Sequence, residues 1–327
     1  IKDNIFLYGK DDPSLEMHEY LQDLLEKRIN DEKLLQQGVD PEIVAQTKTH
    51  VNINAFKIDS TDGEEKTSAT PIKMALGYIM GIFIYFFIFF YSTQVMRGVI
   101  EEKTSRIVEV IISSVRPFQL MMGKILGVGA VGILQFLIWV VLTSVIYVVA
   151  STFLFADLFS AQEAAVAGSP AADLANSPGL EILNMLQSIN FPVILGGFAF
   201  YFFAGYFLYS ALFAAVGSAV DQETDSQQFM LPVTAPIIIA IVTAMNVIKE
   251  PNGDLAFWMS IFPLTSPISM IIRLPFGVPV WQVLLSGALL IGSFFGVVSF
   301  AAKIYRVGIL MYGKKITWKE LFKWLKY

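Results

Sequence analysis

Long apolar runs dominate the hydrophobic pattern of this chain. Five segments of at least 19 residues are almost free of charge, and polar or mixed stretches separate them. A helix rises about 1.5 Å per residue, so each run is long enough to cross the roughly 30 Å hydrocarbon layer of a bilayer. The pattern predicts five membrane-spanning helices, at residues 72–96, 125–155, 191–220, 230–248 and 280–302.

The near absence of charge argues against the buried helices of a soluble core. Apart from Lys73 at the edge of the first run, no run holds an Asp, Glu, Lys or Arg. A charge at the centre of a span costs about 2.5 to 3.5 kcal/mol, whereas soluble core helices normally keep one charged face. The composition agrees, because only 16% of residues are charged, against roughly 25% in soluble domains. We therefore predict an α-helical polytopic protein of the cell (inner or plasma) membrane.

The distribution of Lys and Arg predicts the orientation of these spans. Residues 97–124 carry five basic and three acidic side chains, and residues 303–327 carry seven basic side chains and one acidic. Because short basic loops stay in the cytoplasm, both segments are predicted to be cytoplasmic. Residues 156–190 hold four acidic side chains and no Lys or Arg, which fits the outer side. Counting back through the spans places residues 1–71 outside.

The first 71 residues are polar, with 15 acidic and 8 basic side chains. They are placed outside although no signal segment precedes them, so we expect a further span upstream and six spans in all, with both termini inside. We expect residues 1–71 to be a partial extracytoplasmic α+β domain. Its predicted elements are an amphipathic helix at 14–37, a second helix from 40–47, a strand at 50–58 and a linker at 61–68.

Motifs for catalysis, metals and nucleotides are missing from the sequence. There is no Cys, and the two histidines, His18 and His50, lack the spacing of a metal or catalytic site. No GxxxxGK[ST] motif is present. GVGAVG at 127–132 satisfies GxGxxG but lies inside an apolar helix, where it is typical of a packing face, as are Gly77 and Gly81. We expect no enzyme activity, metal, cofactor or nucleic-acid partner in this chain.

Apart from Lys73, the polar groups of the spans are neutral, among them Gln135, Thr143 and Ser144. A proton-coupled carrier normally needs ionisable groups at membrane depth, so that class is disfavoured, while a sodium site built from carbonyls and hydroxyls stays open. If the protein moves a solute against a gradient, the energy is expected to enter through a cytoplasmic partner.

The charged segment at 97–124 is the best candidate for that entry point. As a helix over residues 99–115, at about 100° per residue, it gathers apolar side chains on one face and polar ones on the other. The apolar face holds Ile100, Ile107, Val108, Ile111 and Val115, and the polar face holds Glu102, Ser105, Arg106, Glu109 and Ser113. Pro117 then opens the next helix. Such a helix is predicted to lie along the inner membrane surface.

An interfacial lipid anchor is the alternative interpretation of this helix. Anchors are usually rich in Lys and Arg, whereas this polar face is mixed in sign, with Glu102 in favourable order four residues before Arg106 and Glu109 three after it. Mixed charge suits a protein partner better. The helix also joins two spans directly, so a force on it would move both.

The segment EEKTSRIVEVIISSVRPFQLMMGKILG resembles the signature cytoplasmic segment of permease subunits of type-2 ABC transporters. Thr104 and Ser105 stand where many relatives have a glycine. The stretches 221–232 and 262–275 are similar to the family's second inside loop and to its Pro-rich outside segment of short half-inserted helices. The subgroup it looks most like is the sodium-efflux permeases. The matching residues are Glu101, Glu102, Lys103, Arg106, Glu109, Pro117, Gly123 and Lys124.

The resemblance implies a six-span permease that works as two copies, as a homodimer or a heterodimer, in the lipid bilayer. Each copy would dock onto a separate ABC ATP-binding subunit, which would hold the ATP and magnesium. Residues 72–305 would form the permease domain, with a coupling helix at 99–115, and residues 306–327 a cytoplasmic tail. The expected partner-coupling residues are Glu101, Glu102, Arg106 and Glu109, with residues 221–228 as a weaker second contact.

These observations predict the membrane subunit of an ATP-driven exporter that moves a substrate out of the cytoplasm. Sodium ions and an amphiphile both remain open as the substrate. The alternatives are a non-transporting membrane sensor or scaffold whose outside domain binds a ligand, and a gradient-driven secondary carrier.

Overall fold

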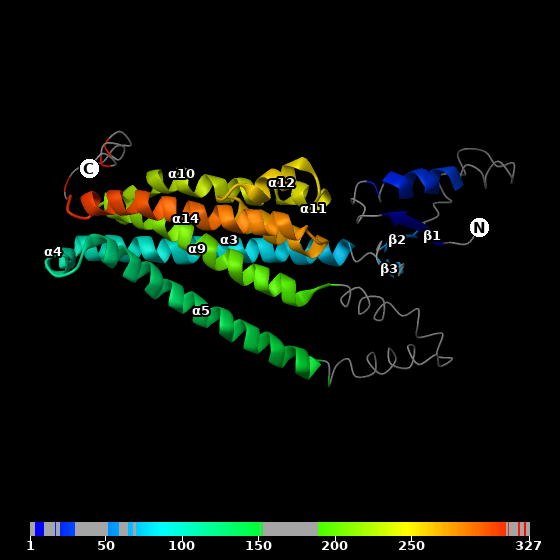
Figure 1. Cartoon of the computed structure of the whole chain (residues 1–327), viewed down its shortest axis with the longest axis horizontal. Helices are drawn as coiled ribbons and strands as arrows, with labels where there is room; N and C mark the ends of the chain where they lie inside the picture. The colour runs from blue at the N-terminus through cyan, green and yellow to red at the C-terminus, as the bar shows by residue number, and fades with distance from the viewer. Residues whose placement is uncertain are drawn as a thin grey trace.

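The computed structural model describes residues 4–9, 17, 20–29, 52–58, 65–67, 70–150, 152, 189–311, 313, 320 and 324. Within these residues, long helices run side by side, and a small sheet lies beyond one end of them (Figure 1). The long helices are α3 (Thr70–Thr104), α5 (Pro117–Val149), α9 (Phe191–Ala219), α10 (Glu223–Val242) and α14 (Val280–Gly308).

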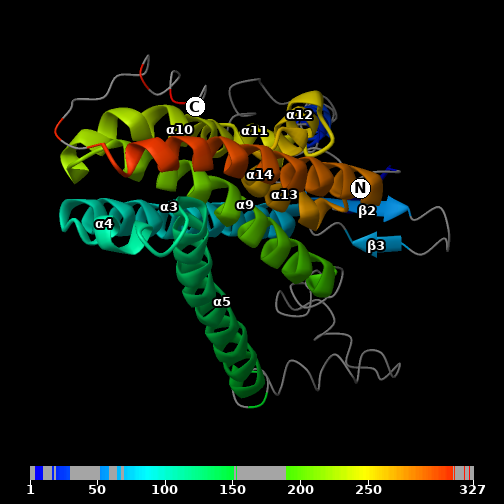
Figure 2. The same ribbon diagram turned by 60° about the vertical axis from the view of Figure 1, so that its left-hand side comes forward.

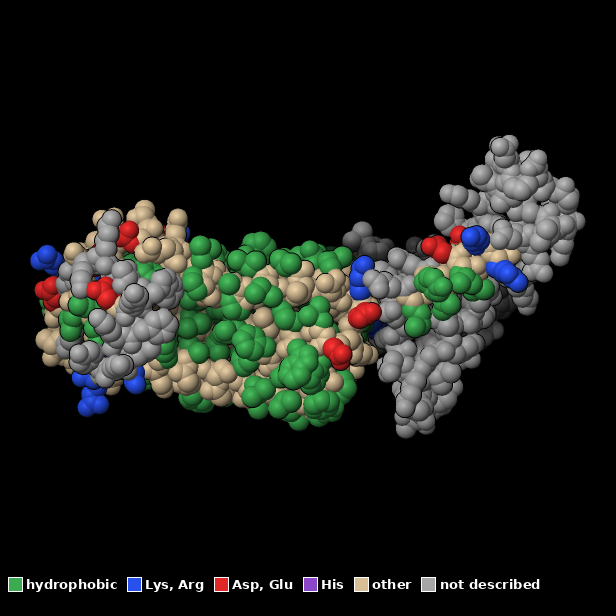
Figure 3. Space-filling view, turned by 90° about the horizontal axis from the view of Figure 1, so that it is seen from above, with side chains coloured by type: hydrophobic (Ala, Val, Ile, Leu, Met, Phe, Trp, Pro, Cys, Tyr) green, Lys and Arg blue, Asp and Glu red, His purple; other side chains and the backbone are tan. Residues whose placement is uncertain are grey.

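All five predicted spans are confirmed as helices long and apolar enough to cross a membrane. The fourth combines α10 with α11 (Ala244–Lys249), and the chain turns at Thr243 between them, where the hydroxyl donates to the Ile239 carbonyl over 2.8 Å. The first span extends past the predicted run to Thr104, because the polar residues that follow the run, Glu101 to Lys103, are also good helix formers. On the face that Figure 3 shows, charged side chains gather at the two ends of the bundle and leave an apolar middle.

Helix α9 forms the centre of the bundle. Its second half is almost entirely buried, from Tyr201 to Ala219. Helix α3 packs along one side of it and α14 along another. At Gly217 a Cβ atom would lie 2.7 Å from the Met96 carbonyl oxygen, so the missing side chain lets the α3 backbone come close. The core of the molecule therefore lies along α9.

Helix α5 leans away from the rest of the bundle (Figures 1 and 2). Near its start it is anchored, since Met121 and Ile125 are buried and the Tyr206 hydroxyl donates to the Ile125 carbonyl over 2.6 Å. Beyond Val131 most of its side chains are exposed. One end of α5 is thus packed and the other end diverges.

Short helices lie between the fourth and fifth spans, as predicted for residues 262–275, and they pack into the bundle. They are α12 (Asp254–Ile261), α13 (Ser266–Arg273) and the 3-10 turn η2 (Leu274–Phe276). All eight residues of α13 are buried. Its backbone lies directly against α3, because a Cβ atom at Gly77 would come within 2.5 Å of the Ile272 carbonyl oxygen.

Arg273 is buried at the end of α13. Its guanidinium donates to the Pro251 carbonyl over 2.6 Å, to the Gln282 side chain over 2.9 Å and to the Ser260 hydroxyl. Burial lowers the pKa of Arg273 to about 10, which leaves the group charged near neutral pH. Arg273 therefore joins the ends of α11, α12, α13 and α14.

The sheet contains three strands in the order β1-β2-β3. Strand β1 (Asn4–Gly9) runs parallel to β2 (Asn52–Ile58), with Asn4 opposite Asn52, and β3 (Glu65–Thr67) is antiparallel to β2. The strand predicted at 50–58 is confirmed, and residues 20–29 of the helix predicted at 14–37 are helical. The linker predicted at 61–68 is wrong at β3, because residues 65–67 pair with the edge of β2. The helix predicted from 40–47 lies outside the described residues.

The close approach at Gly77 gives a test of the α3–α13 contact. We expect Gly77→Ala to lower the free energy of unfolding by about 1 to 3 kcal/mol, because the methyl group would meet backbone that cannot move aside. Unfolding by SDS in mixed micelles measures the change. The matched control is Gly296→Ala on α14, which has open space around it and should be neutral or up to about 1 kcal/mol more stable. Equal effects at the two positions would contradict the described contact.

Candidate coupling site

The chain between α3 and α5 makes a short helix rather than the predicted continuous one. Helix α3 ends at Thr104, Arg106 takes a left-handed conformation with φ of 56°, and α4 (Ile107–Ile112) follows. The single helix predicted over 99–115 is therefore wrong. We call the end of the bundle that carries α4 the α4 end.

Two local features explain the break. The Thr104 hydroxyl donates to the Ile100 carbonyl over 2.8 Å and the Ser105 hydroxyl to the Glu102 carbonyl over 3.2 Å, and such side-chain bonds compete with regular helix bonding. Lys103 and Val108 are both fully buried. In a straight helix these two side chains would point about 140° apart, so a turn between them is needed for both to face the bundle.

The break splits the predicted apolar face. Val108 anchors α4 to the bundle, while the Ile107 side chain is 52% exposed and the Val110 side chain 74% exposed. Arg106 and Glu109 are exposed beside them. Helix α4 therefore presents two apolar side chains flanked by charges of opposite sign.

Three of the four predicted partner-coupling residues are exposed at the α4 end, namely Glu101, Arg106 and Glu109. Glu102 differs, because it is half-buried and its carboxylate lies 2.7 Å from the Lys124 ammonium. This pair joins the last turn of α3 to α5. Glu102 thus lies under the predicted contact surface rather than on it.

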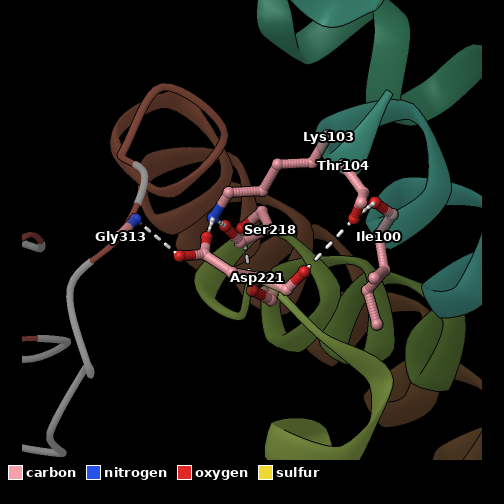
Figure 4. Close-up of polar contacts among 7 residues, drawn as sticks. Ile100, Lys103, Thr104, Ser218, Asp221 and Gly313 are labelled. Carbon is pink, nitrogen blue, oxygen red and sulfur yellow. Dashed lines mark hydrogen bonds and ion pairs between the residues drawn. The ribbon is translucent and has the colours of Figure 1, made fainter. Parts of the chain in front are cut away.

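Lys103 makes the central contact at this end, which sequence reasoning missed (Figure 4). Its side chain is 1% exposed, and its ammonium lies 3.0 Å from the Asp221 carboxylate and donates to the Ser218 carbonyl over 2.8 Å. Asp221 accepts two more bonds, from the Gly313 N–H to its carboxylate over 2.7 Å and from the Thr104 hydroxyl to its carbonyl over 3.2 Å. The only signal in the sequence was that Asp221 is the first charge after the run 191–220.

The position of Lys103 matches the free carbonyls at the end of α9. Ser218 belongs to the last turn of this helix, whose carbonyl groups have no partner within the helix. A positive charge at a helix C-terminus is also favoured by the helix dipole. Lys103 therefore caps α9 with a side chain that comes from α3.

A third ion pair links α3 to α10. The Arg97 guanidinium lies 2.7 Å from the Glu223 carboxylate, and both side chains are more than half exposed, at 56% and 57%. Such an exposed pair contributes little stability, roughly 0 to 1 kcal/mol. Beside it a polar hollow of about 570 Å³ is lined by Asp221, Asp225 and neighbouring residues. The two predicted partner segments, 99–115 and 221–228, therefore lie at the same end of the bundle.

Among the described residues, no group of three or more His, Cys, Asp or Glu side chains comes together as a metal site would require. The α4 end instead presents an exposed short helix, separated from α3 by two residues and from α5 by four, beside three ion pairs of the last turns of α3.

Comparison with known proteins shows the family of the chain. A family model described as ABC-2 family transporter protein matches residues 3–303. The chain belongs to this family. It is a multi-pass membrane protein of the ABC-2 permease type, and the family supplies the transporting membrane part rather than a catalytic one. The likeness to the sodium-efflux subgroup stays a prediction.

Two curated relatives are similar to most of the chain. "Uncharacterized protein YhaP" from Bacillus subtilis (strain 168) is 28% identical over 286 residues, which are 87% of this chain and 62% of that protein. "Uncharacterized protein MJ1024" from Methanocaldococcus jannaschii is 28% identical over 295 residues, 89% of this chain and 63% of that protein. The chain thus spans less than two thirds of the length of these relatives. No solved structure matches it.

Removing one partner of the buried Lys103–Asp221 ion pair tests how much the pair contributes to stability. We expect Lys103→Met to lower the free energy of unfolding by about 3 kcal/mol, because the Asp221 carboxylate and the Ser218 carbonyl lose a charged donor at a buried position. SDS-induced unfolding in mixed micelles measures this change.

The matched control is Arg97→Met, which breaks the exposed pair on the same helix and should cost less than about 1 kcal/mol. An equally small loss in Lys103→Met would show that the buried pair does not hold the α4 end together.

Proposed function

We propose that this chain is the permease subunit of an ATP-driven ABC exporter and that α4 is its contact with a separate ATP-binding subunit. In this proposal the α4 end faces the cytoplasm, the sheet lies outside, and the substrate moves outward. Two permease copies, identical or different, would form the transporter. ATP and magnesium would bind in the partner, since this chain has no P-loop motif.

The surface of α4 is the observation that carries this proposal. Val110 and Ile107 are exposed on it, and Arg106 and Glu109 flank them. An apolar centre with a charged rim is typical of a protein interface. A lipid anchor would instead present mainly Lys and Arg to anionic headgroups. The mixed charge of α4 therefore favours a protein partner.

The connections of α4 support its role in transmitting force. Only residues 105–106 separate α4 from α3, and only residues 113–116 separate it from α5, so no long loop would absorb a displacement. The Glu102–Lys124 pair holds those two helices together directly above it. The Lys103–Asp221 pair passes the same displacement on to the turn between α9 and α10. A push on α4 would therefore reach four of the five long helices.

The α4 contact is tested with the exposed residues rather than with Glu102. We expect Val110→Asp combined with Glu109→Lys to abolish co-purification of the ATP-binding subunit, because the pair reverses the charge and removes the apolar centre of the contact. ATP hydrolysis by the reconstituted complex should fall to the rate of the isolated ATPase. Thermal stability of the permease in detergent should be unchanged, since both side chains are exposed.

The control is Glu250→Lys, an exposed charge reversal at the other end of the bundle. It should leave both the complex and its ATPase rate unchanged. Full retention of the partner by the α4 double variant would remove α4 as the contact.

A further inference from the structure

A wedge-shaped cavity opens where α5 leans away from α3 and α9. Its volume is about 660 Å³. Pockets for small molecules in proteins typically measure about 300 to 1,000 Å³. We propose that this wedge binds an uncharged amphiphile that carries a hydrogen-bond acceptor. The inference rests on the proposed function, because it assigns the substrate class of the same exporter.

The walls of the wedge are apolar and aromatic. The Phe136 ring of α5 stacks on Phe198 of α9 with centroids 6.0 Å apart, and Phe198 stacks on Phe202 at 6.4 Å. Among the residues that the structure describes, no Asp, Glu, Lys, Arg or His side chain lines the cavity. A charged group would enter it without a counter-ion at membrane depth, which is costly. The walls therefore select an uncharged, largely apolar molecule.

Four polar side chains interrupt this lining, the pair Tyr91 and Gln135 and the hydroxyl residues Thr143 and Ser144. The Tyr91 hydroxyl of α3 donates to the Gln135 carbonyl oxygen of α5 over 2.6 Å. The Gln135 amide keeps two N–H donors, and within the described part of the chain no acceptor lies within hydrogen-bond distance of them. Because Gln135 lines the wedge, these donors are available to a ligand there. An ether, ester or hydroxyl oxygen is the matching group.

The shape of the wedge argues against two other occupants. Gly132 lines it where α5 is close to α9, since a Cβ atom there would lie 3.5 Å from the Phe202 ring, and the α5 helix diverges from α9 beyond that point (Figure 2). A taper of this kind suits a single acyl or alkyl chain better than another helix, which is about 10 Å wide. A sodium ion would need several converging oxygens, whereas the Tyr91 and Gln135 oxygens bind each other and the Ser144 hydroxyl bonds the Val140 carbonyl within α5, which leaves the Thr143 hydroxyl as the remaining side-chain oxygen of the lining.

The wedge is also connected to α4. Helix α5 is tied at its packed end by the Lys124–Glu102 pair, next to the proposed partner contact. A displacement of α4 would turn α5 about this end and change the width of the wedge. The proposed displacement of α4 by the ATP-binding subunit would therefore open or close this site.

Photolabelling of the full chain, purified with its partner in nanodiscs and without ATP, tests the binding itself. The probe is a monoacylglycerol with a diazirine on its chain, and labelled peptides are mapped by mass spectrometry. We expect labels on the facing residues of α3, α5 and α9. Val140→Trp, which fills the wedge from α5, should remove most of this labelling. Ile138→Trp, a matched substitution on the same helix that does not line the wedge, should not.

A second experiment tests the proposed hydrogen bond from the Gln135 amide to the ligand. We expect Gln135→Leu to weaken competition by unlabelled monoacylglycerol by about tenfold, the loss of one hydrogen bond, while a plain alkane competes as before. Equal labelling of wedge and outer surfaces, or an unchanged Val140→Trp variant, would overturn the proposal. So would cross-linking of a Thr143→Cys variant, in this cysteine-free chain, to another polypeptide in place of the lipid.

The two levels of the proposal fail separately. If the unmodified complex hydrolyses ATP and keeps its partner but is not labelled at the wedge, the amphiphile site alone is overturned. Labelling at the wedge in a chain that binds no ATP-binding subunit overturns the proposed function and leaves a lipid-binding site.

Discussion

The burial of the Lys103 ammonium is the interaction on which the α4 end depends. Removing a charge from water costs several kcal/mol unless partners replace the lost hydration. The replacements come from one short stretch of chain, the Ser218 carbonyl at the end of α9 and the Asp221 carboxylate after it. Because both partners are required, the end of α3 has one position relative to the turn between α9 and α10. This fixed geometry would make α4 a firm support for the proposed partner.

A second buried cation closes the opposite end. Arg273 donates to a backbone carbonyl, a hydroxyl and a side-chain amide, from segments that surround the short helices. In the apolar middle of the bundle, burial of apolar surface does little to specify the position of the helices, because lipid and core are alike in polarity. Close packing at residues such as Gly77 and Gly217, together with the two pinned ends, supplies that specificity.

The sequence predicts the spans well because a long charge-free run has few alternatives in water or in lipid. The short helices within residues 262–275 were also predicted, because the segment contains prolines and resembles the Pro-rich segment of the family. The break at Arg106 was not, because it depends on burying Lys103 and Val108 together, and their partners lie far away in the chain. For the same reason Glu102 was assigned to the surface. In the continuous helix predicted over 99–115, Arg106 is the natural ion-pair partner of Glu102, so the pairing with Lys124 was not predicted.

The position of α5 is fixed by polar contacts mainly near its start. Its first turns are held by Lys124 and by the Tyr206 hydroxyl on the Ile125 carbonyl, and no comparable polar contact with the bundle lies beyond the Tyr91–Gln135 pair in the described part of α5. A helix held at one end turns about that end when the support moves. Since its support is the segment that contains α4, a small displacement there becomes a larger one at the far end of α5. In the proposed exporter, the volume of the wedge would therefore change when a force is applied at α4.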